Sequence, residues 1–136
     1  MQKEIKQTWF FDQSPQEVWD YFTKPELIEQ WLGENDFQPV VGHKFQFTSP
    51  YGNHSYCEVL EVNPVTKLSY SWQKRSAKDK NPFHSTIEWT FIPKDDGTEV
   101  RLLHGGFTAI EDVVAHENGW NICSKQLAEL LNTVKK

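Results

Sequence analysis

The chain has 136 residues, a length typical of one domain, and its two cysteines fit neither a disulfide framework nor a zinc-binding spacing. Its net charge is −5 with acidic and basic residues interspersed, which argues against a nucleic-acid-binding face. No segment approaches the ~20 apolar residues of a membrane span, and the amino terminus lacks the apolar stretch of a signal peptide. We therefore expect a single cytoplasmic, monomeric domain over residues 1–136, without a metal, another cofactor or membrane insertion.

The first third of the chain predicts one strand and two short helices. Apolar alternation over residues 3–11 favours the strand. The stretch "SPQE" is typical of a helix start, because Ser14 and Glu17 can each accept a hydrogen bond from the other's backbone N–H, and the proline between them suits the first turn. A second short helix, "ELIEQWLG", would follow the next proline and end at Gly33.

Beyond Pro39 the apolar residues recur at every second position, which predicts five strands. The turns between them are short, and "PKDDGT" is the tightest hairpin signal, so we expect an antiparallel meander. The basic run over residues 74–80 is typical of a solvated loop, and "PYGN" of a turn. Gly105 and Gly106 would bend the chain away from the last strand. With residues 3–11 the sheet would have six strands; the other five are "HKFQFTS", "SYCEVLEV", "LSYSW", "STIEWTFI" and "EVRLLH".

The segment "HENGWNICSKQLAELLNTVKK" predicts a final helix. Its large apolar residues recur at helical spacing, beginning with Trp120. A curved antiparallel sheet has one large apolar face to cover, and this is the longest helix available to cover it. We therefore expect the helix to lie over the sheet, with Trp120 near its start.

The order of these elements resembles the helix-grip fold of the START-like, or SRPBCC, superfamily. Within it the chain is most similar to the family named for the carboxy-terminal domain of the activator of the heat-shock protein 90 ATPase. That family often has two glycines where this chain has Gly42-His43. The stretches that carry the resemblance are "SPQEVWDYFTKPELIEQWLG", "GHKFQF", "YCEVLEVNPVTKLSYSW", "GTEVRLLHGGF" and "GWNICSKQLAELL", which span nearly the whole chain.

The resemblance implies an α+β helix-grip fold. This fold would have a six-stranded curved antiparallel sheet, two short helices, and a long C-terminal helix across the concave face. It also implies a deep cavity between sheet and helix, often used for lipids or other apolar small molecules. An empty apolar void of ~300 Å³ would cost ~7 kcal/mol, so the cavity must be closed by aromatic side chains, filled with water or occupied by a ligand.

Two residues could carry chemistry. Glu58 lies in mid-strand with apolar residues on its own face; if that face is interior, the carboxylate must be paired, hydrogen-bonded or protonated. A carboxylate satisfied near a strand edge is the commoner case. His104 raises the same question, although a core histidine is more often structural than catalytic. The histidines show no metal-ligand spacing, and no G-x-S-x-G elbow accompanies "HGG", so no catalytic residue is assigned beyond these two candidates.

The favoured hypothesis is a binding protein for a small, largely apolar molecule, lipid-like or aromatic, in the sheet–helix cavity. A second hypothesis is a protein-interaction module with a chaperone-related partner, active in the stress response. A third is an enzyme acting on a hydrophobic substrate, which would need Glu58 and His104 to converge within about 3 Å of one reacting group. The predicted ligand-binding residues are Trp31, Phe45, Phe47, Tyr56, Glu58, Tyr70, Trp72, Trp89, His104, Phe107, Trp120 and Cys123.

Overall fold

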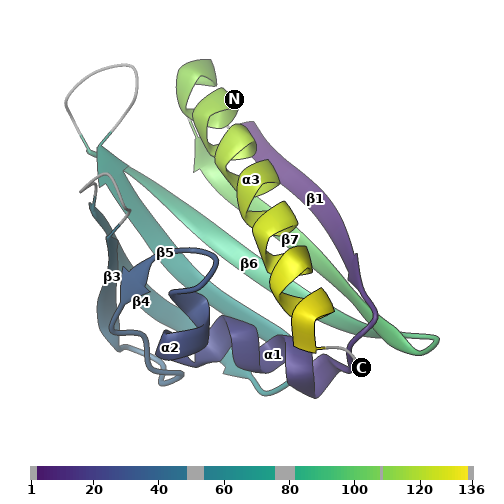
Figure 1. Ribbon diagram of the computed structural model, residues 1–136. Coiled ribbons are helices and arrows are strands. Elements are labelled where there is room, and N and C mark those ends of the chain that lie inside the picture. Colours follow the sequence, from purple (N-terminus) through teal and green to yellow (C-terminus); the bar gives the residue numbers. More distant parts are fainter. Residues whose placement is uncertain (1–2, 49–53, 76–81, 108, 135–136) are drawn as a thin grey trace.

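The computed structural model describes residues 3–48, 54–75, 82–107 and 109–134. One antiparallel sheet, in the order β1-β7-β6-β5-β4-β3-β2, carries the helices on a single face (Figure 1). The first strand therefore pairs with the last, and β1 and β2 are the two edge strands of the sheet. The elements are β1 (Lys3–Phe11), α1 (Pro15–Thr23), α2 (Pro25–Ile28), β2 (Glu34–Asn35), β3 (Lys44–Thr48), β4 (His54–Asn63), β5 (Lys67–Arg75), β6 (Pro82–Lys94), β7 (Gly97–Phe107) and α3 (Ile110–Val134).

The predicted α+β architecture is confirmed, but the prediction of six strands is wrong, because the sheet has seven. The additional strand is β2, whose two residues pair with the end of β3. Two residues are too few to show an alternating pattern, so this strand is defined by its contacts alone. The Asn35 side-chain amide donates to the carbonyls of Pro25 and Gly33, and its oxygen accepts from the Phe37 N–H. A Cβ atom at Gly33 would lie 2.9 Å from the Thr48 carbonyl oxygen, so this edge requires glycine.

The predicted start of α1 is confirmed. The Ser14 side chain accepts from the Glu17 N–H at 3.3 Å, and the Glu17 carboxylate accepts from the Ser14 N–H at 3.2 Å. These bonds satisfy backbone donors that have no partner within the helix. The helix then packs its apolar side on β6, where Trp19 and Phe22 both contact Phe91 edge-on.

Replacing Ser14 by alanine is expected to lower the free energy of unfolding by about 1 kcal/mol, because the cap loses its side-chain oxygen. Urea denaturation monitored by circular dichroism measures this loss. Gln16→Ala is the matched control, since Gln16 lies on the same turn and its side-chain amide donates to the half-buried Asp20 carboxylate. An equal effect of the two substitutions would contradict the proposed importance of the cap.

The alternation in β4 is interrupted by a register shift between Val59 and Glu61. Cys57 and Val59 are buried, whereas Tyr56 is 53% exposed and lies on the opposite, outer face. An extra residue at Leu60 makes two residues of β4 oppose one of β5, so the faces exchange beyond it. The sequence pattern places Tyr56 and Val62 on one face, whereas the bulge between them puts them on opposite faces.

Strand β7 continues through Gly105 and Gly106 to Phe107, so the predicted bend away from the sheet is wrong. Gly106 adopts a φ of +101° at a register shift between β1 and β7, where the backbone bulges without leaving the sheet. A Cβ atom there would lie 3.1 Å from the His84 carbonyl oxygen. The glycine thus allows β7 to pass close to β6.

Helix α3 crosses the helix-bearing face of the sheet diagonally (Figure 1). It begins at Ile110, so Trp120 lies in its middle. The sequence pattern had indicated a position near the start of the helix, which is wrong. The early turns carry few large apolar residues, which is why periodicity alone missed them. Leu127 and Leu131 are almost fully buried farther along, and the Gln13 side chain donates to the Leu131 carbonyl.

The predicted hairpin at "PKDDGT" is confirmed: Lys94 pairs with Gly97 across a turn in which Asp95 has a φ of +51°. The predicted turn at residues 50–53 and residues 76–80 of the predicted loop lie outside the described residues, whereas residues 74 and 75, also predicted as loop, continue β5. Within the described part of the chain, no helix combines the length and the apolar character needed to cross a membrane.

Candidate functional site

Four indole rings occupy the centre of the space between sheet and helices. They are Trp9, Trp31, Trp89 and Trp120, here called the tryptophan cluster, and each is at most 7% exposed. The Trp89 ring lies 5.2 Å from that of Trp9 and 5.3 Å from that of Trp120, measured between ring centroids. Rings at such distances and tilts are in contact. The cluster therefore joins β1, α3 and β6 into one aromatic core.

A second group, the phenylalanine cluster, consists of Phe37, Phe45 and Phe47 on the β3 side of the same interior. Their ring centroids lie 6.2, 5.4 and 6.3 Å from that of Tyr70 on β5. The phenol ring of Tyr70 is thus held by phenylalanines. Its hydroxyl reaches the other cluster, where Trp89 Nε1 donates to it at 2.9 Å.

Tyr70 therefore connects the two clusters through a buried hydroxyl. Burial raises the pKa of this hydroxyl well above its ordinary value, and it stays protonated at any physiological pH. The thiols of Cys57 on β4 and Cys123 on α3 act electrostatically on the same hydroxyl. Burial raises the pKa of Cys123 to about 11 and that of Cys57 further, so both thiols are protonated and poorly nucleophilic.

His104 is the centre of a buried hydrogen-bond chain. Trp120 Nε1, which can only donate, lies 3.0 Å from His104 Nδ1. The neutral imidazole must then carry its proton on Nε2, which donates to Ser85 Oγ at 2.8 Å. Ser85 in turn donates to the Trp72 carbonyl oxygen at 2.9 Å. Each polar atom of the imidazole is thus satisfied in one tautomer.

Burial, and to a lesser extent the His116 imidazole with its ring centroid 5.3 Å away, lower the pKa of His104 to about 2. The side chain is inaccessible to solvent. A histidine that stays neutral under all ordinary conditions does not exchange protons near neutral pH. Its role in this arrangement is to orient Trp120 and Ser85.

The chain of bonds continues to α3 through His116. Trp72 Nε1 donates to His116 Nε2 at 3.3 Å, and His116 Nδ1 donates to the Asp112 carbonyl one helical turn earlier. Sequence reasoning named neither Ser85 nor His116 as a site residue. Two signals were present. Ser85 lies two residues before the buried Ile87, on the same face of the strand, and His116 lies four residues before Trp120 on the same helix face.

Most of the predicted ligand-binding residues face this interior. Tyr56 and Glu58 do not: they lie on the outer face of the sheet, in the row that contains Ser71, whose hydroxyl accepts from the Glu58 N–H. His104 lies on the opposite face from this row, so the sheet separates it from Glu58 and the two cannot act on one group. The residues placed inside are Trp31, Phe45, Phe47, Tyr70, Trp72, Trp89, His104, Phe107 and Trp120, with Cys123 half-buried beside them.

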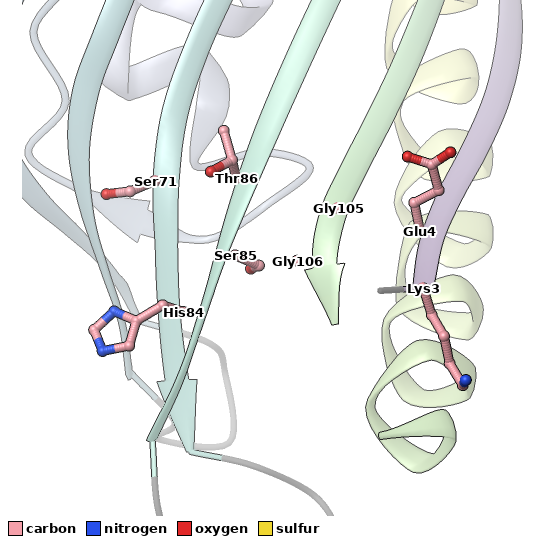
Figure 2. Close-up of a pocket in the computed structure, with 8 residues that line it drawn as sticks. All are labelled: Lys3, Glu4, Ser71, His84, Ser85, Thr86, Gly105 and Gly106. Carbon is pink, nitrogen blue, oxygen red and sulfur yellow. The ribbon is translucent and has the colours of Figure 1, made fainter. Parts of the chain in front are cut away.

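The outer face carries a pocket of about 480 Å³ near the end of β7. Gly105 and Gly106 form part of its wall, which lacks side chains there, and the ends of β1 and β6 flank it. Figure 2 shows the His84 ring and the Lys3 side chain pointing away from each other, so the polar groups do not converge on one point. The pocket therefore offers a surface hollow without an assembled set of catalytic groups.

The protein-interaction hypothesis calls for an exposed apolar patch. Val40, Val41 and Leu60 are 56%, 62% and 45% exposed. They lie near one another, because the Gly42 N–H donates to the carbonyl of Val59, the residue before Leu60. These three side chains are the surface that such a role would use.

A family model described as "Activator of Hsp90 ATPase homolog 1-like protein" matches residues 12–132, which is most of the chain. The chain belongs to this family. The match agrees with the resemblance derived from the sequence, and it covers every element of the interior except β1. Membership also places the chain in the START-like superfamily, whose shared feature is the helix laid over a curved sheet.

Solved structures repeat the fold over nearly the whole chain. Protein MLL2253 from Mesorhizobium loti is 30% identical, with a TM-score of 0.91, and the match covers 98% of this chain and all of that one. CalU16 from Micromonospora echinospora is 24% identical, with a TM-score of 0.79, over 99% of this chain and 76% of that one. DynU16, a protein in the dynemicin biosynthetic locus, is 21% identical, with a TM-score of 0.84, over 97% of this chain and 48% of that one. Below 25% identity the likeness shows the fold alone. None of the curated proteins that were compared matches the chain.

Proposed function

We propose that this protein binds a small, uncharged, largely apolar molecule between the sheet and α3. The observation that carries the proposal is the aromatic wall on β3, β4 and β5. The α3 backbone comes nearest to β1 and β7, at the other side of the sheet (Figure 1). The wall lies on the β3–β5 side and faces the same interior. Its side chains are Phe45, Phe47, Cys57, Tyr70 and Trp72.

The chemistry of this wall selects for an apolar ligand. Aromatic side chains supply large contact areas with little loss of conformational freedom, and small-molecule sites are lined mainly by such groups. Among the described residues, the buried polar side chains include no lysine and no arginine. A ligand carboxylate or phosphate would lack a counter-charge there and would lose its hydration. The ligand class is therefore neutral and aromatic or lipid-like.

Family membership and the solved neighbours support this proposal. The family shares a fold that commonly accommodates hydrophobic ligands, and DynU16 is a protein in a biosynthetic locus. A biosynthetic setting fits a small organic molecule better than an ion. We further place the protein in the cytoplasm, where Cys57 and Cys123, which are unpaired thiols, stay reduced.

Binding is tested with 2-acetylnaphthalene and 2-ethylnaphthalene, two neutral aromatic probes, through the quenching of tryptophan fluorescence and the melting temperature. A saturable quench should appear, and at ten times Kd the folded state should gain about 1.4 kcal/mol. Phe47→Ala should weaken binding, because Phe47 lies on the wall. Tyr56→Ala is the matched control on the outer face and should not change the affinity. Absence of saturation with both probes, or equal effects of the two substitutions, would overturn the proposal.

A further inference from the structure

We propose that the bound molecule carries an uncharged oxygen acceptor, such as a ketone, ester or ether, that receives a hydrogen bond from the Tyr70 hydroxyl. This inference rests on the proposed function and adds the polar part of the ligand to it. The acceptor would lie at the junction of the phenylalanine and tryptophan clusters, with the apolar body of the ligand against the aromatic wall.

The Tyr70 hydroxyl has an unused donor. It accepts a hydrogen bond from Trp89 Nε1, but its own hydrogen has no acceptor among the residues that the structure describes. The side chain is only 3% exposed, so bulk water does not readily reach it. Buried donors without an acceptor are rare in folded proteins, and each one calls for an explanation. A ligand oxygen is the explanation that fits an aromatic wall.

The neighbouring ring donors are already occupied. Within the described interior, each indole N–H of the tryptophan cluster and that of Trp72 has an acceptor, so none of them competes for the ligand oxygen. The acceptors are the Gln7 side chain for Trp9, the Tyr21 carbonyl for Trp31, the His116 imidazole for Trp72, the Tyr70 hydroxyl for Trp89 and the His104 imidazole for Trp120. Among these aromatic side chains, the hydroxyl of Tyr70 is therefore the donor that remains available to orient a ligand.

The surroundings of the hydroxyl select a neutral acceptor. Cys57 and Cys123, the ionisable groups that act on it, are both held protonated by burial. Neither supplies a positive charge that could balance an anion. Both side chains are also small compared with the rings around them. A carbonyl or ether oxygen, which needs one donor and no counter-charge, suits this position.

The two naphthalene probes separate this inference from the proposed function, because they differ in the carbonyl group. The ratio of the Kd of 2-ethylnaphthalene to the Kd of 2-acetylnaphthalene is measured in the wild-type protein and in Tyr70→Phe. We expect the ratio to fall about five- to tenfold in Tyr70→Phe, the loss expected for one buried hydrogen bond. Tyr56→Phe removes a hydroxyl from the outer face and should leave the ratio unchanged.

Tyr70→Phe also removes the acceptor of the Trp89 indole and could unfold the chain, so a measurement on the wild-type protein accompanies it. The infrared carbonyl stretch of bound 2-acetylnaphthalene should lie below its frequency in dry cyclohexane, because a donated hydrogen bond weakens the C=O bond. Saturable binding of both probes with an unchanged ratio and an unshifted carbonyl would overturn this inference and leave the proposed function standing. Failure of both probes to bind would overturn the two together.

Discussion

Alanine in place of Trp120 is expected to lower the free energy of unfolding by about 3–5 kcal/mol, the usual cost of removing a large buried ring. The indole is 3% exposed and contacts the rings of Trp9, Trp72 and Trp89. The substitution also removes the donor to His104 Nδ1 and leaves a buried acceptor without its partner. Urea unfolding followed by circular dichroism measures the loss, and binding assays on this variant must be interpreted against it.

Two controls divide this effect into its parts. Trp120→Phe keeps an aromatic ring and removes the indole N–H, so it should lose about 1–3 kcal/mol through the stranded His104 acceptor and the reduced packing. Ile122→Ala, on the same helix and 65% exposed, should change stability by less than about 0.5 kcal/mol. If Trp120→Ala were as mild as Ile122→Ala, the ring would not be part of the core.

Stability is expected to fall on acidification through His104. Its pKa is about 2 in the folded protein and near its ordinary value of 6.5 when unfolded, so only the unfolded chain takes up a proton between these values. The contribution of His104 to stability is therefore nearly constant above pH 6.5 and falls below it by up to about 1.4 kcal/mol per pH unit. Between pH 7.5 and pH 5.0 the loss from this one group is about 2 kcal/mol.

His104→Gln isolates this contribution. The variant should be less stable than the wild type at pH 7.5, because the bonds to Trp120 and Ser85 are disturbed. Its stability should nevertheless change about 2 kcal/mol less than that of the wild type between pH 7.5 and pH 5.0. Chemical denaturation at both pH values measures the difference. Identical pH dependence of the two proteins would mean that His104 is accessible to protons in the folded state.

Local patterns of the sequence predicted the elements whose cause is local. The bonds between Ser14 and Glu17 start α1, and the Asp95-Asp96 turn joins β6 to β7, as expected. In both cases residues within a few positions of each other satisfy or shape the same stretch of backbone. The alternation of β3, β5 and β6 was equally readable, because one face of each strand is buried over most of the residues whose burial the structure describes.

Features that depend on contacts across the chain could not be derived in this way. Strand β2 forms because Glu34 and Asn35 pair with the end of β3. The bulge at Leu60 is likewise defined by strand pairing, since two residues of β4 there oppose one residue of β5. This bulge is also where face assignments by alternation change. Glu58 was a candidate on the condition that its face is interior, and the structure places it outside.

The sequence by itself indicated the family, through the stretches that resemble it, and it also indicated the helix-over-sheet architecture and the aromatic composition of the interior, which follow from periodicity and residue type. Only the tertiary structure decided how the polar atoms of that interior are paired. Trp120 and Ser85 meet at His104 although they lie 16 and 19 positions from it in the chain. Such pairings arise where a helix and several strands pack together, and the unused Tyr70 hydrogen becomes visible only once the other partners are known.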